Sequence, residues 1–228
     1  MLGIKNKANK TTGKENTMRA IIAIHGIRSN KKDNWIYSFC DFAKADLRFQ
    51  GDVVLPYYYG FLPAIDSVNG FDRLRFIRGF MKFLRGVKSD YPQADLNIVA
   101  HSYGTEISFQ AIKRSGEDSV KKGPILVNKL ILAGSIVSAH REIPYADTLR
   151  AGKIKEMHCY CSYEDEVCRY NPFGHSGCFG FLKHVHDPVC YPKPFDDLNI
   201  FNHQTNTLEH CDYFTKQYEQ KWLDIIAK

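Results

Sequence analysis

The sequence has no uninterrupted apolar stretch of the ~20 residues that a membrane-spanning helix needs, so we expect no stable membrane insertion. Its first seventeen residues also lack the apolar core of a signal peptide. The chain contains no arginine-rich block and no internal repeat, which argues against a nucleic-acid-binding protein. These absences favour a cytoplasmic protein.

The net charge of +6 is unevenly distributed. Half of it comes from residues 1–17, where four lysines stand against one glutamate. This Lys/Asn/Thr-rich segment has no periodicity, and we predict that it is a disordered basic arm. The remaining excess is spread along the chain without a cluster, so no nucleic-acid partner is expected.

The cysteine count and the chain length are those of an ordinary globular protein. Seven cysteines are an odd number in a chain that needs no covalent cross-links, so we expect free thiols and a reducing compartment. With 44% hydrophobic and 25% charged residues, the chain has the composition of a folded domain. We predict that residues 18–228 form a single domain.

Short apolar runs alternate with helical patterns along the chain. β-branched runs that end at glycine or serine are typical of strands buried on both faces of a parallel sheet. The predicted strands are 21–26, 53–59, 96–102, 127–135 and 156–165. The predicted helices are 35–47, 71–86, 105–115, 145–150 and 213–227. This alternation predicts an α/β fold of three layers, with a mostly parallel sheet flanked by helices.

The predicted helix at 71–86 is amphipathic and basic. Its apolar positions are Leu74, Ile77, Phe80, Met81 and Leu84, and its basic ones are Arg75, Arg78, Lys82 and Arg85. Such a helix can lie on a membrane surface, but packing on a sheet with its charges in water is the commoner case. We predict the second arrangement.

A small-x-Ser-x-Gly pattern stands where a buried strand gives way to a helix: Ala100, His101, Ser102, Tyr103 and Gly104. It resembles the nucleophile elbow of the α/β-hydrolase superfamily, G-x-S-x-G, with alanine in place of the first glycine. The tight turn strains the serine backbone and requires small neighbours two residues away, a condition that alanine can meet. The resemblance implies an α/β-hydrolase fold with Ser102 as the nucleophile.

The same resemblance implies two backbone donors for an oxyanion. One is the N–H of Tyr103, at the positive end of the helix that follows the serine. The other is the N–H of Ile27, because the segment 24–28 is similar to the superfamily's His-Gly oxyanion loop. His25 and His101 are expected to have structural roles.

A serine nucleophile requires a base that is oriented by a carboxylate. In the superfamily the acid follows a later strand, and the segment 163–167 is similar to its Asp-x-Val pattern. Asp165 occupies the position of the acid, with Glu164 and Glu166 as alternatives.

Nine histidines compete for the role of the base. His210 stands directly before the last predicted helix, in a stretch that looks like the superfamily's His-x-Asp-Tyr-Phe pattern. His203 is the main rival, and His186 is a weaker one. The resemblance implies the chain order Ser102, Asp165, His210.

The stretch between the acid and the base is rich in metal-binding residue types: Cys168, His175, Cys178, His184, His186 and Cys190. Their spacing matches no standard zinc module, so we expect no metal. With its glycines at 174, 177 and 180, the stretch is instead predicted to be a long loop on the rim of the site.

Together these features predict a serine hydrolase that cleaves carboxylic (acyl) esters through an acyl-enzyme on Ser102, without a cofactor. The expected partner is a small-molecule or lipid ester. The alternative is a non-catalytic binding protein with the same fold, because fold does not guarantee activity. A basic surface protein is a third possibility. Acyl length, the choice among esterase, lipase, thioesterase and amidase, and the oligomeric state stay open.

Overall fold

A six-stranded sheet forms the centre of the structure, a computed structural model that describes residues 17–27, 35–60, 70–117, 123–139, 144–181 and 198–228. The strand order is β2-β1-β3-β4-β5-β6, and every pairing in this sheet is parallel. The strands are β1 (Arg19–Ile24), β2 (Val53–Tyr57), β3 (Asp95–His101), β4 (Val127–Ala133), β5 (Ile154–Ser162) and β6 (Ile200–Thr205). The predicted three-layer α/β fold is confirmed.

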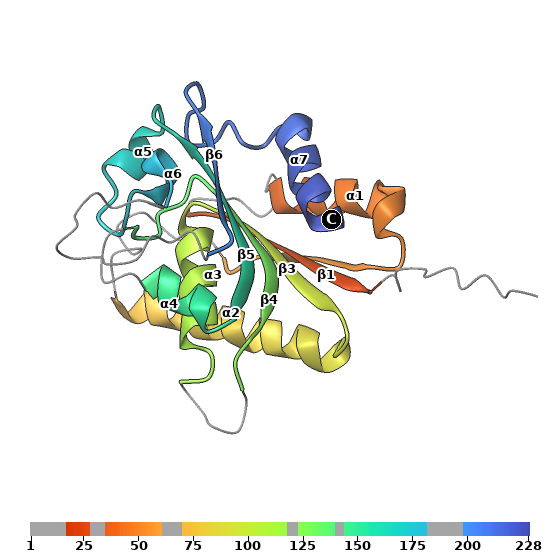
Figure 1. The fold of residues 1–228 in the computed structure, drawn as a ribbon. Helices are drawn as coiled ribbons and strands as arrows, with labels where there is room; N and C mark the ends of the chain where they lie inside the picture. The colour runs from red at the N-terminus through yellow and green to blue at the C-terminus, as the bar shows by residue number, and fades with distance from the viewer. Residues whose placement is uncertain (1–16, 28–34, 61–69, 118–122, 140–143, 182–197) are drawn as a thin grey trace, which may run out of the picture.

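Helices cover both faces of the sheet (Figure 1). Helices α1 and α7 lie on one face, and α2, α3 and α4 lie on the other. Their bounds are α1 (Trp35–Ala45), α2 (Gly70–Asp90), α3 (Tyr103–Arg114), α4 (Pro144–Arg150), α5 (Glu166–Arg169), α6 (Ser176–Phe179) and α7 (Lys216–Ala227), with a 3-10 turn, η1, at Leu47–Phe49. None of the helices in these described ranges has the length and hydropathy that crossing a membrane requires.

The strands are apolar without interruption because successive side chains enter different cores. In β1, Ile22 and Ile24 pack in the core below α2 and α3, whereas Ile21 and Ala23 pack in the core below α1 and α7. Sheet residues of both cores are fully buried. The central strands are therefore held on both sides, and they support the turns at their carboxyl ends.

Helix α2 packs its apolar face on the sheet, as predicted. Ile77, Phe80, Met81 and Leu84 are buried. Leu74 is half-buried, while Arg75, Arg78 and Lys82 are exposed. The helix runs to Asp90, four residues beyond the predicted end at Gly86.

The sequence patterns missed strand β6 and misplaced the start of the last helix. In β6 only Ile200 is buried, and polar residues occupy positions 202–205, so the strand has no apolar run to detect. Helix α7 begins at Lys216 after the N-cap Thr215, rather than at Tyr213. Tyr213 is fully buried, and its side chain belongs to the core although it lies before the helix.

Candidate active site

Ser102 lies in the turn between β3 and α3 with an unusual backbone conformation. Its φ is 54° and its ψ is −126°, and no other described residue besides glycine has a positive φ. Such a conformation costs on the order of 1–3 kcal/mol and persists only where the surroundings hold it. The Ser102 N–H donates to the carbonyl of Ala133 on β4 at 3.1 Å, and the Thr105 hydroxyl donates to the Ser102 carbonyl at 2.5 Å.

Close packing around this turn explains the small residues beside the serine. A Cβ on Gly104 would lie 2.5 Å from the carbonyl oxygen of His25 and 2.9 Å from that of Ile24. A Cβ on Gly26 would lie 2.7 Å from the Cβ of Ser102. Ala100 is inside β3, where its methyl group is accommodated in the fully buried sheet. The first turn of α3 and the end of β1 are thus in direct backbone contact.

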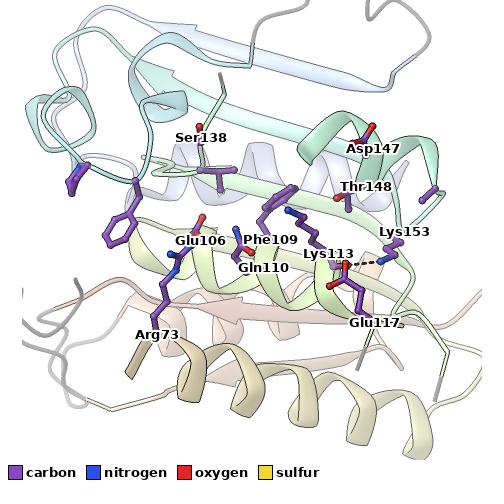
Figure 2. Close-up of a pocket in the computed structure, with 14 residues that line it drawn as sticks. Arg73, Glu106, Phe109, Gln110, Lys113, Glu117, Ser138, Asp147, Thr148 and Lys153 are labelled. Atoms are coloured by element: carbon purple, nitrogen blue, oxygen red, sulfur yellow. Dashed lines mark hydrogen bonds and ion pairs between the residues drawn. The ribbon is translucent and has the colours of Figure 1, made fainter. Parts of the chain in front are cut away.

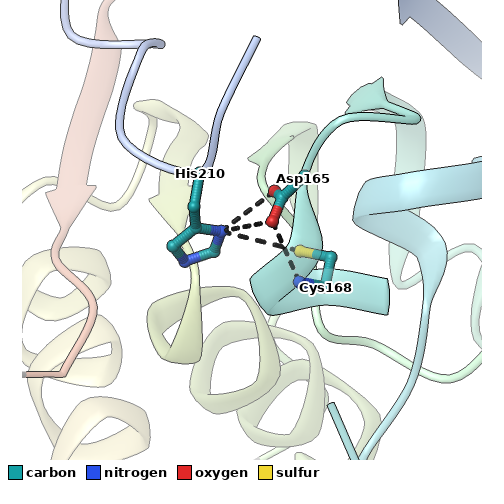
Figure 3. Close-up of side chains that lie close together, drawn as sticks. All are labelled: Asp165, Cys168 and His210. Atoms are coloured by element: carbon teal, nitrogen blue, oxygen red, sulfur yellow. Dashed lines mark hydrogen bonds and ion pairs between the residues drawn. The ribbon is translucent and has the colours of Figure 1, made fainter. Parts of the chain in front are cut away.

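His210, in the turn before α7, joins Ser102 to Asp165. Its Nε2 lies 2.8 Å from the Ser102 Oγ, and its Nδ1 lies 2.9 and 3.0 Å from the two carboxylate oxygens of Asp165. Because the carboxylate accepts only, Nδ1–H donates to it, and Nε2 accepts the hydroxyl proton of Ser102. The structure brings together the three side chains that the sequence patterns selected (Figure 3 shows the His210–Asp165 part).

Asp165 follows β5 and caps the short helix α5. Its side chain accepts a hydrogen bond from the N–H of Cys168 at 2.9 Å, and it has no exposed surface. Burial by itself raises the pKa of this carboxyl, but the hydrogen bond and charge of His210 and the Cys168 amide outweigh burial and lower the pKa. Asp165 is therefore held as a carboxylate that faces His210.

Two further histidines hold loops beside the site. His101 Nε2–H donates to the carbonyl of His210 at 2.8 Å, and burial lowers the pKa of His101 to about 3. His25 accepts a hydrogen bond from the N–H of Tyr59 at 3.3 Å, and burial lowers its pKa to about 4. Both rings are thus neutral at ordinary pH, and each ties one loop to another.

The comparisons with known proteins rest on structure, since no family model and no curated protein matches the sequence. An uncharacterized protein from Bacillus cereus ATCC 10987 has a TM-score of 0.62 and 14% identity, and the match covers 99% of this chain but 62% of that protein. A protein assigned to the α/β superfamily of hydrolases, from Xanthomonas campestris pv. campestris, has a TM-score of 0.52 and 11% identity, covering 91% and 98% of the two chains. Esterase PE8 has a TM-score of 0.53 and 13% identity, covering 92% of both.

The chain has the α/β-hydrolase fold. In this fold, Ser102 lies at the carboxyl end of β3, and Asp165 lies beyond the carboxyl end of β5, at the edge of the sheet where ligands bind in parallel α/β proteins. At these levels of identity the likeness concerns the fold alone.

The rival residues have other environments in this α/β-hydrolase fold. His203 is on the edge strand β6, where its Nε2 lies 3.1 Å from the Nδ1 of His158 and its ring stacks on Tyr160. Glu164 and Glu166 are exposed. His186 lies outside the described residues.

The predicted oxyanion donors belong to segments that flank the serine. Tyr103 begins α3, and Ile27 follows Gly26 in the loop that packs against Ser102. Ile27 is half-buried against the core on the α2 and α3 side. The role of the two amides in binding an oxyanion stays a prediction.

Within the predicted rim loop, the described residues 168–181 include the end of α5 and all of α6, and several of their side chains pack into the core, so this part is less irregular than predicted. Its place on the rim of the site stays a prediction. Cys168, Cys178 and Phe181 are buried in the same cluster as β5. Gly177 N–H donates to the Ser135 carbonyl at 2.6 Å, so the backbones touch where a side chain would not fit. The glycine-rich pattern suggested loop turns, but Gly177 serves close packing instead. The remainder, 182–190, lies outside the described residues.

Two pockets lie near these elements. One of about 470 Å³ includes His210 and is lined by three glutamates, Glu164, Glu166 and Glu209. Another, of about 650 Å³, runs along α3 between α2 and α4 and includes none of the three site residues (Figure 2). At one end of it Arg73 pairs with the buried Glu106, whose pKa burial raises.

Proposed function

We propose that this protein is a serine hydrolase that cleaves carboxylic esters through an acyl-enzyme on Ser102. The observation that carries the proposal is the unbroken chain of contacts from Ser102 through His210 to Asp165. The three groups come from three separate turns of the fold, and nucleophile, base and orienting acid are all present. The similarity in fold to esterase PE8 is consistent with this proposal.

In the proposed reaction, the Ser102 oxygen attacks the ester carbonyl while His210 Nε2 accepts the hydroxyl proton. Asp165 stabilises the imidazolium that forms and keeps Nδ1 protonated. His210 then gives the proton to the leaving alcohol, which departs as the acyl-enzyme forms. A water molecule, deprotonated by His210, hydrolyses the acyl-enzyme and regenerates Ser102.

The proposed oxyanion donors are the N–H groups of Tyr103 and Ile27. Tyr103 is the first residue of α3, and the helix dipole favours negative charge at that end. Removing one such donor from an oxyanion hole typically slows catalysis by about 10²–10³-fold. The contact between Gly26 and Ser102 supports this assignment because it holds the loop that carries Ile27 against the nucleophile.

A fluorophosphonate probe, which reacts with activated serines, tests the proposal. Wild-type protein should become labelled, and Ser102→Ala should not. Ser108→Ala is a matched control, because Ser108 is fully buried on α3 and its hydroxyl has no hydrogen-bond partner among the residues that the structure describes. Absence of wild-type labelling, or equal labelling of Ser102→Ala, would disprove the proposal and favour a non-catalytic binding protein.

Steady-state kinetics with a panel of substrates would identify the substrate class. We propose a small-molecule or lipid ester as the partner, and p-nitrophenyl esters of increasing acyl length measure the preferred length through kcat/KM. Matched thioesters and amides distinguish a thioesterase or an amidase from an esterase.

A further inference from the structure

The proposed mechanism leaves one close contact of the site unused. The thiol of Cys168 lies 3.7 Å from His210 Nδ1, on the nitrogen that faces Asp165 (Figure 3). One ligand atom from each of Asp165, Cys168 and His210 lies within 4.8 Å of the others. A carboxylate, a thiol and an imidazole nitrogen form a mixed O, S and N donor set, which is typical of sites for zinc and similar ions.

The spacing of these atoms is close to that of a metal site. With ordinary zinc bond lengths, a tetrahedral ion holds its nitrogen and sulfur ligands about 3.6 Å apart and its nitrogen and oxygen ligands about 3.4 Å apart. The corresponding distances here are 3.7 Å and 2.9 to 3.0 Å. The third pair, the Cys168 sulfur and an Asp165 oxygen, lies within 4.8 Å, and the His210–Asp165 pair must open by about 0.5 Å to hold an ion.

Charge also favours a divalent cation at this place. Asp165 is an anion, and a metal-bound Cys168 would be a thiolate, so a divalent ion would make the buried cluster neutral. An acidic pocket lies next to this cluster, since His210 lines it together with Glu164, Glu166 and Glu209, and the first two glutamates flank Asp165 in sequence. Such a pocket raises the local concentration of cations.

We propose that Asp165, Cys168 and His210 bind a thiophilic divalent cation such as Zn²⁺, and that the bound ion inhibits the enzyme. Binding stands on the geometry alone, whereas inhibition rests on the proposed serine hydrolase activity. This site differs from a zinc module built within the Cys/His-rich stretch 168–190, because Cys168 is the only one of the three proposed ligands that lies in that stretch.

Inhibition follows from the proton balance. The ion bonds to His210 Nδ1 in place of its proton, and Cys168 loses its thiol proton to form the metal–sulfur bond. The Nδ1 proton moves to Nε2, so that one proton is released in total and the ring stays neutral. Nε2 then carries a hydrogen and can no longer accept the proton of Ser102.

The experiment combines Co²⁺ absorption with protection from the fluorophosphonate probe. In wild-type protein, Co²⁺ should give a thiolate charge-transfer band, and Zn²⁺ should both displace it and block labelling of Ser102, reversibly on addition of a chelator. In Cys168→Ser the thiolate band should disappear. The Zn²⁺ concentration that halves labelling should rise at least tenfold, with the labelling of the same variant without metal as the reference. Cys211→Ser is the matched control, since Cys211 is exposed beside His210.

The outcomes separate the two proposals. A metal that binds wild-type protein without a thiolate band, inhibition that survives Cys168→Ser, or inhibition abolished by Cys211→Ser would overturn the metal site. If the thiolate band appears and depends on Cys168 but the metal-free protein does not react with the probe, the metal site stands and the hydrolase proposal fails. Absence of the thiolate band from wild-type protein overturns the metal site whether or not Cys168→Ser folds, and a band that is retained in Cys211→Ser does not come from the exposed thiol.

Discussion

Gly104→Ala tests whether the contact between α3 and β1 holds the nucleophile in place. The new Cβ would lie 2.5 Å from the His25 carbonyl oxygen and 2.9 Å from that of Ile24, although real Cβ atoms essentially never come within 3.0 Å of another atom. Both neighbours are backbone atoms, so neither can rotate away. The start of α3 must therefore move away from β1 by at least about 0.5 Å.

This displacement predicts losses of both stability and reactivity. Overpacking typically costs about 1–3 kcal/mol, and the gain in helix propensity from glycine to alanine offsets about 1 kcal/mol, so we expect a net loss of up to about 2 kcal/mol. Ser102 lies two residues before the substitution, and its hydroxyl is 2.8 Å from His210. A shift of this size should slow fluorophosphonate labelling by about 10–100-fold.

Urea denaturation measures the first effect, and the rate of labelling measures the second. Gly86→Ala in α2 is the control, because among the described residues the added Cβ meets no atom within 4 Å apart from its chain neighbours and the backbone of its own helix. That variant should gain about 0.5–1 kcal/mol and label at the wild-type rate. A Gly104→Ala protein as stable and as reactive as Gly86→Ala would show that the backbone contact does not position Ser102.

Three further predictions concern buried polar groups. Asp165→Asn should slow labelling by about 10⁴-fold, because the amide can donate to Nδ1 and so favour the tautomer with its proton on Nε2, and because it carries no charge to stabilise the imidazolium. The pKa of Asp165 is lowered in the fold, so the stability that wild type holds over this variant should be present at neutral pH and vanish as the pH falls through that pKa, which denaturation at several pH values measures. His101→Ala should slow labelling about tenfold and leave the pH profile of labelling unchanged, because the neutral His101 ring only holds the His210 carbonyl. Total loss of labelling would contradict this role. Lys129→Met should lose about 1–3 kcal/mol of stability in urea, because the buried ammonium donates to the Ile225 carbonyl, and its labelling should be unchanged.

The sheet could be predicted wherever its strands are buried on both faces. Ile21, Ile22 and Ile24 enter two different cores, and this arrangement produces a continuous apolar run that periodicity detects. Strand β6 has no such run, because polar residues occupy positions 202–205 and Phe201 is exposed. The other edge strand, β2, begins with Val53, Val54 and Leu55 and was predicted, so composition rather than edge position explains why β6 was missed.

The candidate site was predictable where chain order and local chemistry coincide. Ser102 stands at a strand-to-helix turn, and Asp165 and His210 follow in the order that the resemblance implies. The contact of Cys168 with His210 could not be predicted, since it depends on α5 turning back over the end of β5. The choice of His210 over His203 likewise rested on similarity, because both stand near the end of the chain.

The carboxyl end of β4 accounts for the convergence of segments so distant in sequence. The Ala133 carbonyl accepts the N–H of Ser102, and the Ser135 carbonyl accepts that of Gly177, which anchors the segment that follows the acid. Between them, Gly134 has a φ of +52°, and a Cβ there would lie 3.0 Å from His210 Nδ1 and 3.2 Å from Asp165 Oδ2. Ala133 and the two residues that follow it thus bond to the nucleophile turn and to the segment after the acid, and leave room beside Gly134 for His210 and Asp165, so the end of a buried strand helps to position all three groups.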